Sequence, residues 1–335
     1  MDSSPPRVAY SFDAGTFDLR KSCPGLWLMG ESSQSTMVRL DTRWELMLGG
    51  LRELGAVLAS VRSGPLNLAT VWPRVDFQRI PGTYELVELH SGTELRSGML
   101  GSAMAVVDEI DGQQMASLQF STRDGTGCLK IMITEDSDLD AFEQLVRTHA
   151  VATAWGTPTP VESSDPTEAP LPDWKQVKPL WEGLARTRPG RYFPGLAMVP
   201  RLSGLKAAAG SFAWQLQPQV DRLLLEQMTA RRGWMEFAVR NRAVFMPANC
   251  TLSRASFCGC GLTFFSPQTQ LTMRCGDGGA WSTWVVCLPT PEGERWNIEA
   301  YDERGELCIS IGLSDTASDA EETFWRSQLL EGRLA

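Results

Sequence analysis

The feature that most limits the possible folds of this chain is an internal repeat. In the first half, residues 117–120 and 128–131 alternate between apolar and polar side chains, and a turn containing Gly125 separates them. The second half repeats this order with residues 297–300, Gly305 and residues 308–311. Two alternating strands joined by a glycine turn are typical of a β-hairpin. The repeat therefore predicts two similar units, each containing this hairpin.

Each predicted hairpin is followed by acidic residues and then by a helical pattern. Residues 136–138, with the sequence Asp-Ser-Asp, precede apolar positions at helical spacing, namely Leu139, Phe142, Leu145, Val146 and His149. In the second half the acidic stretch is 315–322, and the apolar side consists of Phe324, Trp325, Gln328 and Leu329. Carboxylates favour a helix N-terminus because they meet the positive end of its dipole.

A second helical pattern leads into a strand in both halves, with strands expected at residues 57–62 and 235–240. The sequence thus predicts an α+β protein, a tandem repeat of two antiparallel-sheet units flanked by helices. We expect an N-terminal segment at 1–35, a first repeat at 36–150, a Pro-rich linker at 151–174 and a second repeat at 175–331. A helical region at about 174–214 is interrupted by prolines, so we expect several short helices there.

Composition excludes several classes of function. The chain of 335 residues has a net charge of −9 and no basic run, which disfavours a nucleic-acid partner. No apolar stretch is long enough to insert into a membrane, and residues 1–7 lack the order of a secretory signal, so we expect a cytoplasmic protein. The eight cysteines should then be free thiols. Cys258 and Cys260 lack the repeated spacing of a zinc site, and we expect no metal site.

Several residues carry a resemblance to a known family. In the first half they are Arg39-Leu40, Trp44, Leu54-Gly55, Gly125, residues 134–138 and Ala141-Phe142. In the second half they are residues 265–267, 271–274, 284–286, Pro289-Thr290, 299–302, 305–307 and Trp325. Their order and duplication resemble the HemS/ChuX family of hemin-utilisation proteins over roughly residues 36–331. The resemblance implies two repeats with stacked sheets and binding of heme in the cytoplasm, by a heme chaperone or a heme-degrading enzyme.

The usual heme ligands of that family are missing here. Where the family has an iron-ligating histidine early in the second repeat, this chain has Arg188, which cannot ligate iron because its guanidinium stays protonated. The family's lysine before a Pro-Thr pair is replaced by Leu288. By resemblance, Arg96 and Arg201 contact the heme propionates, and Arg274 is the repeat-related counterpart of Arg96.

Other residues could ligate iron instead. The chain has two histidines: His90 lies near Arg96 in sequence and could face the same cleft, whereas His149 fits a structural position on a helix. Tyr192 lies near Arg188 and is a second alternative ligand. Tyr301, Met198 and the cysteines also have suitable atoms, although packing is their default interpretation. We find no catalytic motif of the GxSxG, P-loop or HExxH type.

The sequence therefore leads to a heme-binding and heme-trafficking protein for iron acquisition, whose partner is heme or a related tetrapyrrole. The alternative is a degenerate member without heme, acting as a structural or protein-interaction module. Heme degradation is a third possibility that the missing axial ligand disfavours, because such chemistry needs iron tuned by that ligand.

Overall fold

The computed structural model describes residues 27–29, 35–64, 66–80, 85–110, 113–151, 172–183, 200–216, 230–251, 254–258, 261–266, 269–274, 282–291, 293–314 and 316–332. The chain divides into two units. Unit 1 consists of Met1–Val61, Ala69–Val161 and Arg242–Phe245, and unit 2 consists of Arg62–Leu68, Glu162–Asn241 and Met246–Ala335. Each unit therefore includes one short segment from the other half of the sequence.

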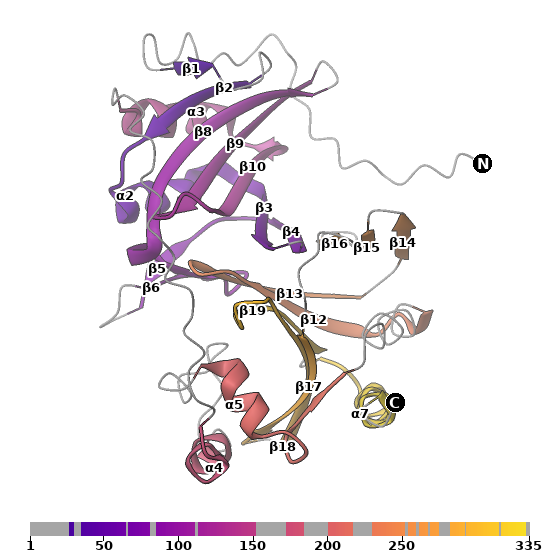
Figure 1. Ribbon diagram of the computed structural model, residues 1–335. Helices are drawn as coiled ribbons and strands as arrows, with labels where there is room; N and C mark the ends of the chain where they lie inside the picture. Colours follow the sequence, from indigo (N-terminus) through magenta and orange to yellow (C-terminus); the bar gives the residue numbers. More distant parts are fainter. Residues whose placement is uncertain are drawn as a thin grey trace, which may run out of the picture. The chain divides into compact units, whose positions relative to one another are not determined.

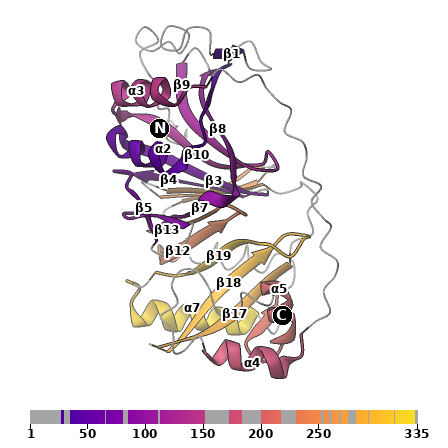
Figure 2. The ribbon, with the colours of Figure 1, turned by 90° about the vertical axis from the view of Figure 1, so that its left-hand side faces the viewer.

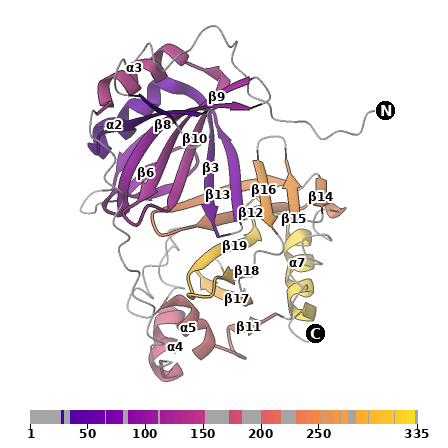
Figure 3. The same ribbon diagram turned by 45° about the horizontal axis from the view of Figure 1, so that its top comes forward.

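Unit 1 contains six neighbouring antiparallel strands in the order β1-β2-β8-β9-β10-β3, which form part of a longer sheet. These strands are β1 (Trp27–Met29), β2 (Ser35–Leu40), β3 (Gly55–Ser63), β8 (Leu100–Ile110), β9 (Gln113–Thr122) and β10 (Gly127–Ser137). The helices of unit 1 are α2 (Trp44–Gly50), the 3-10 helix η1 (Leu51–Leu54) and α3 (Leu139–His149). Figure 3 shows α2 and α3 side by side against this sheet.

The predicted acidic cap of α3 is confirmed. The side chain of Asp138 accepts a hydrogen bond from the backbone N–H of Ala141 at 2.9 Å, which satisfies one of the free donors of the first turn. The helix then buries Phe142, Leu145 and Val146 at the predicted spacing. The acidic residues before the helix thus set where it begins, and its apolar face packs into the core.

Unit 2 contains the same arrangement, with the strand order β11-β17-β18-β19-β12-β13. These strands are β11 (Ala213–Gln215), β12 (Trp234–Arg240), β13 (Val244–Thr251), β17 (Ser282–Thr290), β18 (Gly293–Tyr301) and β19 (Leu307–Leu313). The helices are α4 (Trp174–Gly183), α5 (Arg201–Ala207) and α7 (Asp319–Gly332). Figure 2 shows β17, β18 and β19 running side by side.

The two sheets have equivalent strands in equivalent places, which confirms the predicted α+β tandem repeat. The hairpins β9–β10 and β18–β19 turn at Gly125 and Gly305, whose φ angles are 83° and 76°. Glycine is favoured at both turns because other residues are strained at positive φ. The short helices α4 and α5 are also as predicted for the proline-interrupted region. The linker prolines lie outside the described residues.

Each unit also contains three short antiparallel strands. In unit 1 these are β5 (Phe77–Arg79), β6 (Glu85–Glu88) and β7 (Glu94–Arg96), followed by the 3-10 helix η2 (Ser97–Met99). There β7 pairs with the first residues of β13, Val244 and Phe245. In unit 2 they are β14 (Arg254–Cys258), β15 (Gly261–Phe265) and β16 (Thr269–Arg274), and β16 neighbours β4 (Leu66–Trp72), whose first residues belong to this unit. Arg96 and Arg274 each end the third strand of their group.

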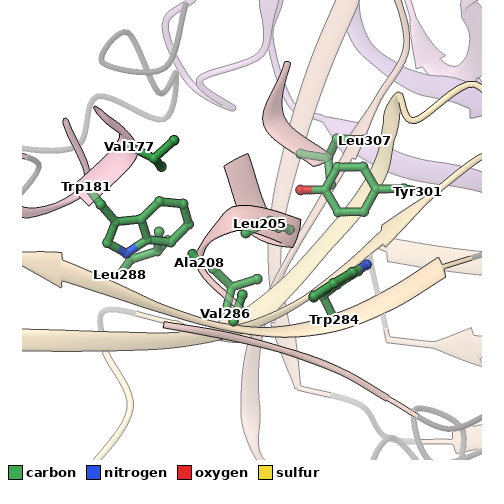
Figure 4. Packing of buried hydrophobic residues seen from close by; sticks show 10 residues of the cluster. Val177, Trp181, Leu205, Ala208, Trp284, Val286, Leu288, Tyr301 and Leu307 are labelled. Carbon is green, nitrogen blue, oxygen red and sulfur yellow. The ribbon is translucent and has the colours of Figure 1, made fainter. Parts of the chain in front are cut away.

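The sheet of unit 2 is covered on both faces by helices. In Figure 1, β17 and β18 lie between α5 and α7. One face packs against α4 and α5 through a buried cluster, shown in Figure 4, that consists of Val177, Trp181, Leu205, Ala208, Ala213, Trp284, Val286, Leu288, Tyr301 and Leu307. The other face meets α7, where the indole of Trp325 donates to the carbonyl of Trp296 at 2.8 Å. The face below α4 and α5 carries the candidate site.

Candidate functional site

The candidate site begins at the N-terminus of α5, where Arg201 is the first helical residue after Pro200. Proline at this position fixes the direction of the chain into the helix. The helix then packs Leu205 into the cluster over β17 and β18. This packing holds the Arg201 side chain over the sheet, where only 10% of it is exposed.

Arg201 forms a two-pronged ion pair with Glu299 of β18. The Nε atom of Arg201 donates to Oε2 of Glu299 at 2.9 Å, and Nη2 donates to Oε1. Glu299 is completely buried. Because the guanidinium and the carboxylate are both planar, this geometry makes two parallel charge-assisted hydrogen bonds. The pair therefore ties α5 to the middle of the sheet.

Tyr301 and Trp181 complete the surroundings of this pair. Glu299 and Tyr301 are two residues apart on one strand, so their side chains lie on the same face, and the Tyr301 hydroxyl donates to Oε2 of Glu299. The guanidinium carbon of Arg201 lies 5.7 Å from the centre of the Trp181 ring. The Trp181 indole in turn donates to the carbonyl of Cys287 at 3.0 Å, which fixes the ring against β17.

The electrostatics of the group favour the ionised pair. Burial alone lowers the pKa of Arg201, but attraction to the Glu299 carboxylate outweighs it, so the pKa lies above its usual value. Burial, followed by the nearby Glu299 charge, raises the pKa of Tyr301 well above its usual value, and the phenol stays protonated. A buried ion pair is tolerated only when its geometry is good and its remaining atoms are hydrogen-bonded. The Tyr301 hydroxyl supplies such a bond.

A row of polar side chains continues along the same face of β18. Arg295 donates to Oε1 of Glu236 and to the carbonyl of Leu313, both at 3.1 Å. Between the two ion pairs lies Asn297, which is 6% exposed and whose Oδ1 atom has no hydrogen-bond partner among the described residues. A side chain at Gly312 would collide with this oxygen. The face below the helices is therefore polar along β18 and apolar along β17.

The fork of Arg201 matches a carboxylate, and in this structure it holds the carboxylate of Glu299. The apolar side chains near it, Trp181 and Trp284, are buried in the cluster below α4 and α5. Arg201, Glu299 and Tyr301 are too deeply buried to act on a substrate in bulk water.

Arg96 lies in unit 1 and has a different environment. Its Nε atom is 3.3 Å from Oε1 of Glu85, and both side chains are about one-third exposed. Its backbone N–H donates to the carbonyl of Ala243 at 2.8 Å. The guanidinium of Arg96 is therefore paired at a strand end and remains open to solvent.

His90 and Arg96 lie at opposite ends of the β6–β7 hairpin. Arg96 pairs across the strands with Glu85, at the open end, whereas His90 belongs to the connecting turn. The backbone N–H groups of His90 and Ser91 donate to Oε2 of the buried Glu88 at 3.1 and 2.6 Å. The His90 side chain is exposed. The structure does not bring it beside Arg96, although the two are close in sequence.

The remaining predicted site residues are described only in part. Arg274 ends β16 opposite Gly261, and nothing beyond its backbone is described. Arg188, Tyr192 and Met198 lie outside the described residues. Leu288, in the place of the family's lysine, is 3% exposed and belongs to the cluster below α4. The roles of the three arginines and of Arg188 stay predictions.

His149 has the structural position expected for it. It is the last residue of α3, and its ring is buried and bonded to Asp41. Among the described residues, no group of three or more His, Cys, Asp or Glu side chains is arranged to hold a metal ion. Nor is any described helix long and apolar enough to cross a membrane.

Sequence reasoning missed the role of Glu299. In the sequence it stands directly between Ile298 and Ala300, two apolar residues that are buried in the same strand. A carboxylate at such a position needs a buried cation or several donors. The sequence thus indicates that Glu299 has a buried partner. It does not indicate which residue that is, because Arg201 lies 98 residues away.

Comparison with known proteins identifies the second half of the chain. Residues 198–331 match the family model for the haemin-degrading HemS.ChuX domain. This match begins just before Arg201 and ends within α7, so it includes Arg201, Glu299 and Tyr301 but not Trp181. No curated protein has a significant sequence match to this chain.

Two solved structures resemble the chain along most of its length. Holo-PhuS, a heme-binding protein from Pseudomonas aeruginosa, has a TM-score of 0.71 at 21% identity, over 88% of this chain and 86% of PhuS. The heme degrading enzyme ChuS from Escherichia coli O157:H7 has a TM-score of 0.75 at 18% identity, over the same shares of the two chains. Residues 198–331 are therefore a domain of the HemS/ChuX family, as the sequence predicted, and the two-repeat fold of that family extends along most of the chain.

Proposed function

We propose that this chain is a cytoplasmic heme-binding protein that handles heme in iron acquisition. The observation that carries the proposal is the HemS/ChuX domain at residues 198–331, on a fold shared with the heme-binding PhuS. The buried arginine at the start of α5 supports it, because a guanidinium fork recognises the carboxylates that heme presents. The tryptophans near it suit the flat macrocycle.

The residues present fit the carboxylates and the apolar body of heme better than they fit its iron. Neither histidine of the chain lies within residues 198–331. Arg188 takes the place of the family's ligand, so heme would be held by apolar burial and by Arg201, with Arg96 and Arg274 as further propionate contacts. His90 and Tyr192 stay alternative iron ligands. Iron itself would supply redox chemistry when bound, but we propose no heme-degrading activity without an axial imidazole.

One observation favours a second candidate function. The Arg201 fork is already occupied by Glu299, and Leu288 fills the core where the family has a lysine. Both features stabilise unit 2 without any ligand. The chain could then serve as a structural or protein-interaction module that has kept the fold of its relatives and lost heme.

A hemin titration followed by absorbance separates the two candidates. The first predicts a Soret shift that saturates at one equivalent, and tighter binding with a sharper Soret band in Arg188→His, which supplies an imidazole. Arg201→Ala should weaken binding about ten- to a hundred-fold, as expected for the loss of charge-assisted hydrogen bonds. Arg295→Ala is the matched control, because it removes another partly buried, paired arginine of the same sheet face.

The controls and the contrary result are equally specific. Arg295→Ala should leave hemin affinity unchanged while showing a similar loss of stability in urea unfolding. If neither the wild type nor Arg188→His binds hemin saturably, while both are folded by circular dichroism, the interaction-module function replaces the heme-binding one.

A further inference from the structure

We propose that Trp181 of α4 is a positioning residue, which holds the guanidinium of Arg201 in the orientation that binds a tetrapyrrole carboxylate. The inference rests on the proposed function, because it concerns the same site and the same ligand. Trp181 lies outside residues 198–331, the part of the chain that the family model matches. It does not bind the carboxylate itself and acts on it only through Arg201.

The first step of the argument is that Arg201 offers more than one edge to a carboxylate. A guanidinium carries five N–H donors in one plane. Glu299 accepts from Nε and Nη2 of Arg201, which together form one edge of that plane. A ligand carboxylate would bind at the second edge, formed by Nη1 and Nη2, while Glu299 stays in place. Because only 10% of the Arg201 side chain is exposed, water competes little for such a charge-assisted contact.

The second step is that the ion pair alone does not fix the plane of the guanidinium. The last torsion of a glutamate side chain is broad, so a carboxylate and the guanidinium bonded to it can tilt together. The Tyr301 hydroxyl donates to Oε2 of Glu299 and restrains that oxygen. It does not lie against the face of the guanidinium ring of donors. A contact on that face is what limits the tilt.

The third step is that Trp181 supplies this contact and is itself held firmly. The guanidinium carbon of Arg201 lies 5.7 Å from the centre of the Trp181 ring, within the range of a cation–π contact. Trp181 is completely buried, and its indole N–H donates to the carbonyl of Cys287 at 3.0 Å. The ring of Phe212 lies 6.2 Å from it, centre to centre. Trp181 therefore orients Arg201 before a ligand arrives.

The test measures the dissociation constants of hemin and of hemin dimethyl ester for each protein, by absorbance titration in one detergent buffer. The two probes share the macrocycle and differ in their carboxylates, so the ratio of the constants reports the carboxylate contact. Trp181→Leu should weaken hemin relative to the ester by about two- to ten-fold, the cost of ordering one flexible side chain on binding. Trp181→Phe keeps an aromatic face over Arg201 and should change the ratio by less than about twofold.

Three further variants make the test specific. In an Arg201→Ala background, Trp181→Leu should leave the ratio unchanged, because the arginine through which Trp181 acts is gone. Trp325→Leu is the matched control, since Trp325 is also a buried helical tryptophan whose indole donates to a carbonyl of the same sheet. It lies on the other face, so it should cost stability and leave the ratio unchanged. Trp181→Met serves if Trp181→Leu does not fold, because methionine fills irregular core space and has no ring.

The outcomes separate the inference from the function on which it rests. If the wild type binds both probes and Trp181→Leu leaves the ratio unchanged, Trp181 does not position Arg201, and heme binding still stands. The inference is also wrong if Trp181→Leu shifts the ratio equally in the Arg201→Ala background, or if Trp181→Phe or Trp325→Leu shifts it as strongly. If no protein binds either probe saturably, the heme-binding function fails and the inference fails with it.

Discussion

The Nδ1 atom of His149, at the end of α3, lies 3.1 Å from Oδ1 of Asp41, directly after β2. The side chains are 7% and 16% exposed, so this contact is largely shielded from water. The backbone N–H of Asp41 also donates to the carbonyl of His149 at 2.8 Å. Together these bonds join the end of α3 to the end of β2.

This contact predicts a loss of stability in acid. Burial raises the pKa of Asp41, but hydrogen bonds from Arg43 and His149 outweigh burial and lower it to about 2. Since this folded value lies below the value of about 3.9 in an unfolded chain, the stabilisation is present above the unfolded pKa and is lost as the pH falls toward 2. Asp41→Asn should lower the unfolding free energy by about 2 kcal/mol at pH 5, and by less at pH 3.

Urea unfolding of the full-length protein at pH 5 and at pH 3 measures the difference in unfolding free energy between the wild type and Asp41→Asn. Asp140→Asn is the control, because Asp140 is an exposed acid in α3, the helix that ends at His149. An equal difference between wild type and Asp41→Asn at pH 5 and pH 3 would contradict the assigned ionisation.

Glu88 should be one of the most sensitive acidic residues in unit 1. Its buried carboxylate accepts the backbone N–H groups of Asp76, His90 and Ser91. Glu88→Ala leaves all of these donors without their acceptor, and we expect the unfolding free energy to fall by about 3 kcal/mol or more. Glu85→Ala, on the same strand, removes only a partly exposed ion pair and should cost less than about 1 kcal/mol. Denaturant titration of both variants tests the contrast.

Gly312 should not tolerate a larger side chain while Asn297 is present. A Cβ atom there would overlap Oδ1 of Asn297, so Gly312→Ala should destabilise the protein by roughly 1–3 kcal/mol through overpacking. Adding Asn297→Ala to it should restore part of this loss, which a double-mutant cycle in thermal unfolding would measure. Gly127→Ala is the matched control, since a Cβ in that strand has open space around it. Strict additivity of the two changes would show that the predicted overlap does not occur.

Four buried cysteines should react slowly in the folded protein. Cys128, Cys250, Cys287 and Cys308 are free and buried. Burial raises the pKa of Cys128 and Cys287 to about 12 and that of Cys250 to about 11, and it also raises that of Cys308. Thiolates are the reactive form, so a thiol reagent at pH 8 should modify these four much more slowly than it does in denaturant. Mass spectrometry of the labelled peptides would identify any of them that reacts quickly in the native state.

Local features of the fold could be predicted from the sequence because their causes lie within a few residues. The turns at Gly125 and Gly305 need positive φ, and the cap at Asp138 needs a carboxylate three residues before a free N–H. Alternating side chains in the strands and the duplication of the whole pattern then indicate two α+β units. No local pattern singled out Arg201, which was predicted only through the resemblance to the HemS/ChuX family.

The tertiary structure alone decided which side chains meet. Arg201 and Glu299 are 98 positions apart, and only the packing of α5 on β18 brings their charges together. His90 and Arg96 are neighbours in sequence, yet the register of β6 and β7 places them at opposite ends of a hairpin. Strand pairing likewise assigns Arg242–Phe245 to unit 1, away from its own half of the chain. Sequence patterns determine how each segment folds because backbone geometry is local, whereas partners depend on register and packing, which no single segment contains.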